Sequence, residues 1–205
     1  EEVFLASTGV IGELFRPQVI TEHLSTLVGG LERPDSKMWE EAANSIRTTD
    51  TFPKGAYSRV GESGSFIAGI AKGSGMIAPN MATMLAFIFT DMEVNEGDLQ
   101  TLTEQSVNKS FNSITVDSDT STSDTVLTFA TGASGASVED HRLDFEEALD
   151  SVMLELAHQI VRDGEGATKF VEIAVTGAKD DAAAKEIGKS IGNPPLVKTT
   201  LADED

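Results

Sequence analysis

The stretch Lys72-Gly-Ser-Gly-Met-Ile-Ala-Pro-Asn-Met-Ala-Thr83 leads directly into an apolar run of the sequence. Its glycines accept backbone conformations that other residues resist, and Pro79 cannot donate a hydrogen bond to a helix or a ladder. The stretch therefore predicts an irregular loop that feeds a buried central strand over residues 83–90. Such a strand would hold its first residue, Thr83, firmly in place.

A threonine at the start of a buried strand, after a small residue and a glycine-containing loop, has the layout of an N-terminal nucleophile. In that chemistry the chain is cut just before the threonine, here between Ala82 and Thr83, and the freed amine acts as the base for the hydroxyl. A β-branched residue that simply begins a strand would look the same. Spacing alone leaves both interpretations open.

Residues 72–91 resemble the self-cleavage segment of the bifunctional ornithine acetyltransferase / N-acetylglutamate synthase family of arginine biosynthesis. Other matching pieces stand in that family's order and run from one end of the chain to the other, at residues 7–12, 48–51, 112–124, 163–169 and 195–199. The long segment is specific, whereas the short glycine-containing pieces would be weak alone. The resemblance covers nearly the whole chain.

The resemblance implies acetyl transfer from N-acetylornithine to glutamate by a ping-pong mechanism, after self-cleavage before Thr83. Thr83 would be the nucleophile that carries the acetyl group. The hydroxyl of Thr8 and the backbone N–H of Gly9 would stabilise the oxyanion. The catalytic residues that the resemblance implies are therefore Thr83, Thr8 and Gly9.

Substrate binding is assigned by the same resemblance to Thr48, Lys72 and Glu165, together with the nucleophile itself. Lys72 can contact a substrate carboxylate, and Glu165 can bind a substrate ammonium group. Taken alone, each of these polar residues could equally be an ordinary solvated or turn residue. No cofactor is implied, and acetyl-CoA stays open as a co-substrate.

The cut would divide the chain into residues 1–82, the C-terminal part of an α chain, and residues 83–205, the N-terminal part of a β chain. The two pieces are expected to stay associated, and the family favours a dimer of αβ pairs. Family members are longer at both ends and bind substrate through an Asn and a Ser or Thr near their C-terminus. This sequence resembles their central portion.

Two other hypotheses remain at this stage. One is a related N-terminal-nucleophile amidase or aminopeptidase, in which water replaces glutamate as the acceptor. The other is an inactive fragment whose truncated pocket no longer binds substrate. Dependence of the reaction on an acetyl acceptor would separate the first from the transferase, and activity restored by a longer chain would indicate the second.

Composition narrows the class of protein. The chain has 205 residues with 34 acidic and 15 basic side chains, a formal charge of −19. That balance argues against nucleic acid and anionic membranes as partners, since basic patches carry such binding. Cysteine is absent, which excludes disulfides and thiolate metal sites. With no apolar run near ~18 residues and no visible signal peptide, a cytoplasmic protein is expected; adaptation to high salt is an alternative reading of the acidity.

The pattern of apolar residues predicts an α/β fold, a layered sandwich of mixed sheets with flanking helices. Apolar spacing and capping residues predict helices, and short apolar runs between turn residues predict strands. The expected helices cover 17–28, 36–46, 98–111, 143–162 and 180–191, and the expected strands cover 3–7, 56–60, 65–71, 83–90, 114–116, 125–131 and 167–176.

Three other patterns do not support a ligand site. Asp117, Asp119 and Asp124 only loosely resemble a calcium-binding loop, because its glycine and distal glutamate are missing, and they predict a structured turn. The lysine of residues 72–75 precedes the glycines, whereas a phosphate-binding loop places it after them. The three histidines are too scattered to form a metal pair. No metal site is expected.

Overall fold

The computed structural model describes residues 3–10, 12–31, 35–77 and 84–203. The secondary structure, in chain order, consists of α1 (Gln18–Thr21), α2 (Leu24–Gly29), α3 (Ser36–Ser45), β1 (Lys54–Arg59), β2 (Phe66–Lys72), β3 (Leu85–Thr90), α4 (Glu96–Lys109), the 3₁₀ turn η1 (Phe111–Ser113), β4 (Thr125–Ala130), α5 (Arg142–Arg162), α6 (Asp181–Gly192) and α7 (Pro195–Asp203).

One mixed sheet forms the centre of the described chain, with the strand order β1-β2-β3-β4. β1, β2 and β3 are antiparallel neighbours, and β4 runs parallel to β3. In this register Leu85 at the start of β3 lies between Lys72 at the end of β2 and Thr125 at the start of β4. The expected central strand is therefore confirmed from Leu85 onward. Its start lies beside the end of β2 and the start of β4.

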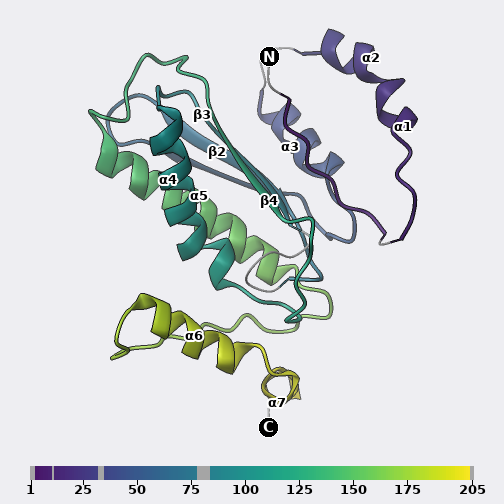
Figure 1. Ribbon diagram of the computed structural model, residues 1–205, viewed down its shortest axis with the longest axis vertical. Coiled ribbons are helices and arrows are strands. Elements are labelled where there is room, and N and C mark those ends of the chain that lie inside the picture. The colour runs from purple at the N-terminus through teal and green to yellow at the C-terminus, as the bar shows by residue number, and fades with distance from the viewer. Residues whose placement is uncertain (1–2, 11, 32–34, 78–83, 204–205) are drawn as a thin grey trace.

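Helices cover both faces of the sheet (Figure 1). α5 and α4 lie along one face, where α5 packs on β1 and β2. α3 lies on the other face, where Trp39 packs edge-on against Phe89 of β3 with ring centroids 5.3 Å apart. The α/β class with a mixed sheet and flanking helices is confirmed.

The core lies between the sheet and α5, whose apolar residues recur at helical spacing. All six residues of this apolar stripe are at most 1% exposed, namely Phe145, Leu149, Val152, Met153, Leu156 and Ile160.

Three helices begin directly after a side chain that caps them. The side chains of Asp35, Asn95 and Asp180 accept the backbone N–H three residues ahead, at the starts of α3, α4 and α6.

Three predicted strands are wrong. Residues 3–7, 114–116 and 167–176 have strand-like composition, but none of them forms a ladder within the described residues. A strand is defined by hydrogen bonds to a neighbour, and composition does not supply the neighbour. Residues 3–7 instead lie against the sheet through one ring, because Phe4 packs edge-on against Phe129 of β4 with centroids 6.0 Å apart.

The predicted helix over residues 17–28 is also only partly right, because it is divided into α1 and α2. His23 interrupts it as the residue before α2. The apolar side chains that share one side of this helical pattern are exposed: Val19 is 64% exposed and Leu27 60%. Helical spacing correctly predicted helical backbone, but it did not show what the apolar side would contact.

Gly69 in β2 marks the closest approach between the sheet and α5. A Cβ atom there would lie 2.7 Å from Cδ1 of Ile88 and 2.9 Å from Cδ1 of Leu156, both buried. We expect Gly69→Ala to lower the free energy of unfolding by about 1–2 kcal/mol, since overpacking outweighs the gain from removing a flexible glycine. Denaturant unfolding measures the difference.

Gly55→Ala is the matched control for that variant, because Gly55 lies in the neighbouring strand and a Cβ there meets only a carbonyl oxygen at 3.8 Å. It should be neutral or slightly stabilising. Equal losses in the two variants would show that strand glycine itself, and not the packing of α5, decides the effect.

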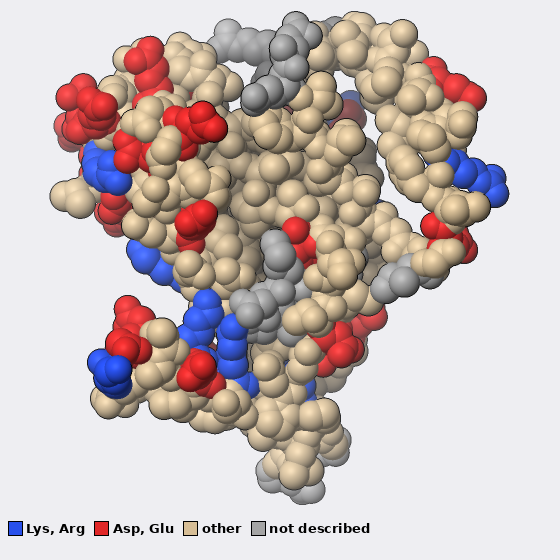
Figure 2. Space-filling model, viewed as in Figure 1, with Lys and Arg blue, Asp and Glu red and all other residues tan. Residues whose placement is uncertain are grey.

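Acidic side chains dominate the charged surface on the face that Figure 2 shows, in keeping with the formal charge of −19. Basic side chains are fewer, and several gather where α6 meets the rest of the molecule. Within the described ranges, every helix is too short or too polar to cross a membrane.

Candidate active site

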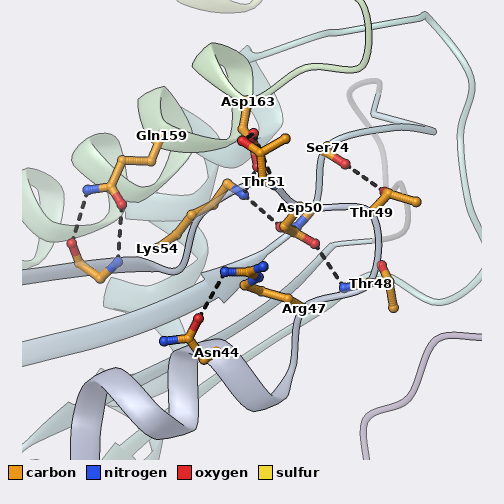
Figure 3. Close-up of polar contacts among 12 residues, drawn as sticks. Asn44, Arg47, Thr48, Thr49, Asp50, Thr51, Lys54, Ser74, Gln159 and Asp163 are labelled. Carbon is orange, nitrogen blue, oxygen red and sulfur yellow. Dashed lines mark hydrogen bonds and ion pairs between the residues drawn. The ribbon is translucent and has the colours of Figure 1, made fainter. Parts of the chain in front are cut away.

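A buried lysine at the start of β1 joins two carboxylates from distant parts of the chain (Figure 3). The ammonium nitrogen of Lys54 lies 2.6 Å from Asp50 and 2.5 Å from Asp163, and all three side chains are at most 2% exposed. The lysine also lies over the ring of Phe52, with its nitrogen 4.8 Å from the ring centroid. Lys54 therefore fixes the turn before β1 to the end of α5.

Asp50 connects this cluster to the loop after β2. Its carboxylate accepts the N–H of Gly73 at 2.6 Å and the N–H of Thr48 at 3.2 Å. Burial raises the pKa of Asp50, but the hydrogen bonds from Gly73, Lys54 and Thr48 outweigh it and hold the pKa below its usual value. Asp50 is therefore ionised at neutral pH and joins the segments that carry Thr48 and Lys72.

Asp163 makes the matching connection on the other side of Lys54. Its carboxylate accepts the N–H of Thr51 at 3.0 Å and also the hydroxyl of Thr51. Asp163 follows the last residue of α5, and Glu165 comes two residues later. The start of the 163–169 motif is thus fixed to the turn that contains Thr48.

Glu165 lies against the glycine-containing loop. Its N–H donates to the carbonyl oxygen of Ser74 at 2.8 Å, and the Ser74 hydroxyl is 2.7 Å from the hydroxyl of Thr49. A Cβ atom on Gly75 would lie 2.8 Å from the carboxyl carbon of Glu165. Only a glycine at position 75 leaves room for the Glu165 side chain where it stands.

Lys72 ends β2 and is 2% exposed. Burial lowers its pKa, while the nearby Asp50 and Asp124 act in the opposite direction. Asp124 lies just before β4, and its carboxylate accepts the N–H of Met84 at 2.7 Å. Lys72, Asp124 and Met84 therefore meet at the point where the chain enters β3.

The structure joins the segments that carry three of the four residues assigned to substrate binding. Hydrogen bonds connect the segments of Thr48, Lys72 and Glu165 around Lys54. The fourth, Thr83, and its predecessor Ala82 at the expected cleavage site, lie outside the described residues. The residue next to them, Met84, is buried and held by Asp124.

Thr8 and Gly9 are placed less directly. Thr8 is half-buried, Gly9 is exposed, and a Cβ on Gly9 would meet no atom within 4 Å. Four residues before Thr8, Phe4 packs on Phe129, whose ring stacks on Phe89 on the α3 side of the sheet. Because side chains alternate along a strand, Lys72 also belongs to that side. The oxyanion role of Thr8 and Gly9 stays a prediction.

Four buried or half-buried charged residues were not predicted as parts of the site: Asp50, Lys54, Asp163 and Asp124. The sequence predicts only a structured turn for Asp124. The available signal was a lysine at the start of a strand, where it can be buried, since a buried charge needs a partner. Nothing in the sequence identified Asp163 as that partner, 109 residues away.

The carboxylates of Asp117 and Asp124 accept hydrogen bonds from backbone N–H groups. In the part of the chain that the structure describes, no three His, Asp or Glu side chains gather in a way that could hold a metal ion. The acidic segment over residues 117–124 is thus a structured turn, as its sequence predicts.

Comparison with known proteins gives consistent results. The model of the ArgJ family matches residues 1–205. The arginine biosynthesis bifunctional protein ArgJ of Ruegeria pomeroyi is 58% identical over 205 residues, which cover 99% of this chain and 49% of that protein. The protein of the same name from Caulobacter vibrioides is 52% identical over 211 residues, covering 100% of this chain and 52% of its own length.

The crystal structure of the arginine biosynthesis bifunctional protein from Bacillus halodurans is similar in fold and sequence. It aligns with a TM-score of 0.55 and 41% identity over 58% of each chain. The chain spans about half the length of the curated relatives it matches.

Proposed function

The chain belongs to the ArgJ family, and on that premise we propose that it forms the central part of a glutamate N-acetyltransferase. The enzyme moves the acetyl group of N-acetylornithine to glutamate, after the chain has cut itself between Ala82 and Thr83. Residues 1–82 and 83–205 then belong to an α and a β piece.

The observation that carries this proposal is the network around Lys54. It joins the segments of Thr48, Lys72 and Glu165 to one another through Asp50, Asp163 and Ser74. Leu85, the first residue of β3, pairs with Lys72 at the end of β2. The segments assigned to substrate binding therefore lie next to the start of β3, and the proposed nucleophile precedes that strand by two residues in the sequence.

Self-cleavage begins when the Thr83 hydroxyl attacks the carbonyl carbon of Ala82. The acyl group moves from nitrogen to oxygen, which frees the α-amine of Thr83, and water then hydrolyses the ester, which restores the hydroxyl and separates the two pieces. An α-amine has a reference pKa of about 7.7–8.0, so a useful fraction is a neutral base near pH 7. That amine can accept the proton of its own hydroxyl.

In the transfer reaction, the Thr83 oxygen attacks the acetyl carbonyl of N-acetylornithine. The carbon–nitrogen bond breaks, the leaving amine takes a proton, and ornithine departs from an acetyl-enzyme. The amine of glutamate then attacks the ester, and the Thr83 oxygen recovers its proton. The hydroxyl of Thr8 and the N–H of Gly9 would stabilise the negative oxygen in both steps.

Charge on the two amino-acid substrates suits the remaining polar groups. Both carry a carboxylate that a protonated Lys72 can bind, and Glu165 offers a carboxylate for the ammonium group of ornithine. We also expect the two pieces to stay together after the cut, since β3 from the second pairs along its whole length with β2 from the first. A dimer of αβ pairs and a cytoplasmic location belong to the same proposal, and acetyl-CoA stays open as a co-substrate.

Acetyl transfer itself is the test. The protein is incubated with N-acetylornithine labelled in its acetyl group, with and without glutamate. We expect labelled N-acetylglutamate only when glutamate is present, parallel double-reciprocal plots, and one labelled acetyl group on the piece that begins at Thr83 when glutamate is withheld.

Two results would contradict this assignment. Release of labelled acetate at the same rate with and without glutamate would indicate an amidase. An absence of label on the protein would show that the chain is inactive by itself, and the same assay on a longer chain, with flanking segments like those of its relatives, would then test for an incomplete pocket.

A further inference from the structure

One short acidic segment holds the chain on both sides of the expected cleavage site. The carboxylate of Asp117 accepts the N–H groups of Met76 and Ile77, the latter at 2.9 Å. The carboxylate of Asp124, seven residues later, accepts the N–H of Met84 at 2.7 Å. Residues 78–83, which contain the bond to be cut, lie between these two attachments.

Backbone contacts strengthen each attachment. The carbonyl oxygen of Ile77 accepts the N–H of Val116 at 2.7 Å, and the carbonyl oxygen of Met84 accepts the N–H of Thr125 at 3.0 Å. Ile77 and Met84 are therefore each hydrogen-bonded through both the N–H and the C=O group to residues 116–125. They are also buried, with Ile77 3% and Met84 6% exposed.

The first attachment is made with unusual backbone geometry. Met76 and Ser118 both have a positive φ, 56° and 72°, although neither is glycine. Such conformations persist only where surrounding contacts enforce them. The hydroxyl of Ser118 accepts a hydrogen bond from the ammonium group of Lys198 at 2.7 Å and donates one to the carbonyl oxygen of Asn193 at 2.6 Å. Residues from α7 and the turn before it thus support this attachment.

In the second attachment, burial disfavours the ionised form of the Asp124 carboxyl group. Burial raises the pKa of Asp124 to about 7, although the N–H of Met84 and the charge of Lys72 lower it. Because the folded pKa exceeds that of an unfolded Asp, the folded state loses stability as pH rises from about 4 to about 7. A half-buried carboxyl with this cost, next to a proposed nucleophile, is a candidate for a functional role.

We propose that Asp117 and Asp124 form a two-ended clamp, which holds Met76, Ile77 and Met84 and thereby sets the rate of self-cleavage between Ala82 and Thr83. After the cut, Asp124 keeps Met84 of one piece in place, while Asp117 holds Met76 and Ile77 of the other. Both are positioning residues, since they act through the backbone and not on the reacting atoms. The inference rests on the proposed function only for the role of Thr83.

The clamp is tested by the rate of self-cleavage, followed by intact mass in freshly purified protein. Asp124→Ala removes the acceptor of the Met84 N–H and should slow the cut about tenfold or more. Asp124→Asn keeps one side-chain oxygen in place and should cut within about threefold of the wild-type rate. Asp117→Asn should be intermediate, because it retains one acceptor oxygen for two N–H groups.

Asp119→Ala is the control for these variants, since Asp119 is exposed and lies in the same segment. It should cut at the wild-type rate. Equal rates for wild type, Asp117→Ala and Asp124→Ala would overturn the clamp. So would equal slowing of Asp124→Ala and Asp124→Asn, because the asparagine keeps the anchor.

Amide hydrogen exchange tests the anchors independently of any cleavage, in an uncut Thr83→Ala background. Asp124→Ala should speed exchange at Met84 and leave Ile77 unchanged, and Asp117→Ala should do the reverse. A wild-type chain that stays whole would contradict the proposed function, and exchange would still show whether the two ends are held. Unchanged exchange at both amides would overturn the clamp whatever the cleavage result.

Discussion

Thr83→Ala is expected to leave the chain whole and to lower acetyl transfer by several orders of magnitude, because the same hydroxyl is the proposed nucleophile of both reactions. Wild-type protein should give two species by intact-mass spectrometry, whose masses meet at the bond between Ala82 and Thr83. The variant should give one species with the mass of the whole chain. A loss of this size in both reactions from one oxygen atom would identify Thr83 as the nucleophile.

Thr83→Ser is the matched control, since it keeps the hydroxyl and loses only a methyl group. It should cut the chain and transfer acetyl groups, although more slowly where the methyl group helps to orient the oxygen. Cleavage of Thr83→Ala at the wild-type bond would show that another group breaks the chain. A wild-type chain that stays whole would show that the chain does not mature by itself.

The elements predicted correctly are those whose sequence pattern and packing agree. The stripe of α5 is apolar on one side only, and that side is buried against the sheet. β2 and β3 are nearly continuous apolar runs, and they are the two inner strands. In these segments local pattern and tertiary contact point to the same structure, so the sequence was sufficient.

Predictions failed where a segment needed a neighbour that its own sequence does not specify. Residues 167–176 have the composition of a strand, yet they form no ladder within the described chain, and Phe170 and Val171 are exposed. α1 and α2 show the same failure, because their apolar spacing predicted a buried side. Spacing describes which residues share a face, but only the fold decides what covers it.

The candidate site was predictable only in part, and mainly through the resemblance to a family. Thr48, Lys72 and Glu165 were assigned from motifs, and the structure brings their segments together. The residues that join them were not assigned, because Lys54 and Asp163 are 109 residues apart and each looks ordinary alone. Long-range pairing of buried charges is a property of the fold and leaves little trace in a single sequence.

Lys54→Met is expected to destabilise the protein by about 3–5 kcal/mol at pH 8, measured by denaturant unfolding. The substitution keeps the length of the side chain and removes its charge, which leaves Asp50 and Asp163 buried without their cation. Because the lowered pKa of Asp50 reflects these contacts, its ionised form adds stability above about pH 4, and this is lost as pH falls through the folded pKa. Protonation relieves the unpaired carboxylates, so the loss caused by the variant should be smaller at pH 4 than at pH 8.

The same change at an exposed ion pair provides the control. Lys109 lies 2.6 Å from Asp150, nearly the same distance as the buried contacts, but its side chain is 64% exposed. Lys109→Met should cost at most about 1 kcal/mol, since water screens that pair. If both lysines cost the same, burial would not be the source of the effect. If Lys54→Met were neutral, the network would not hold the Thr48, Lys72 and Glu165 segments together, and the geometric support for the proposed function would be lost.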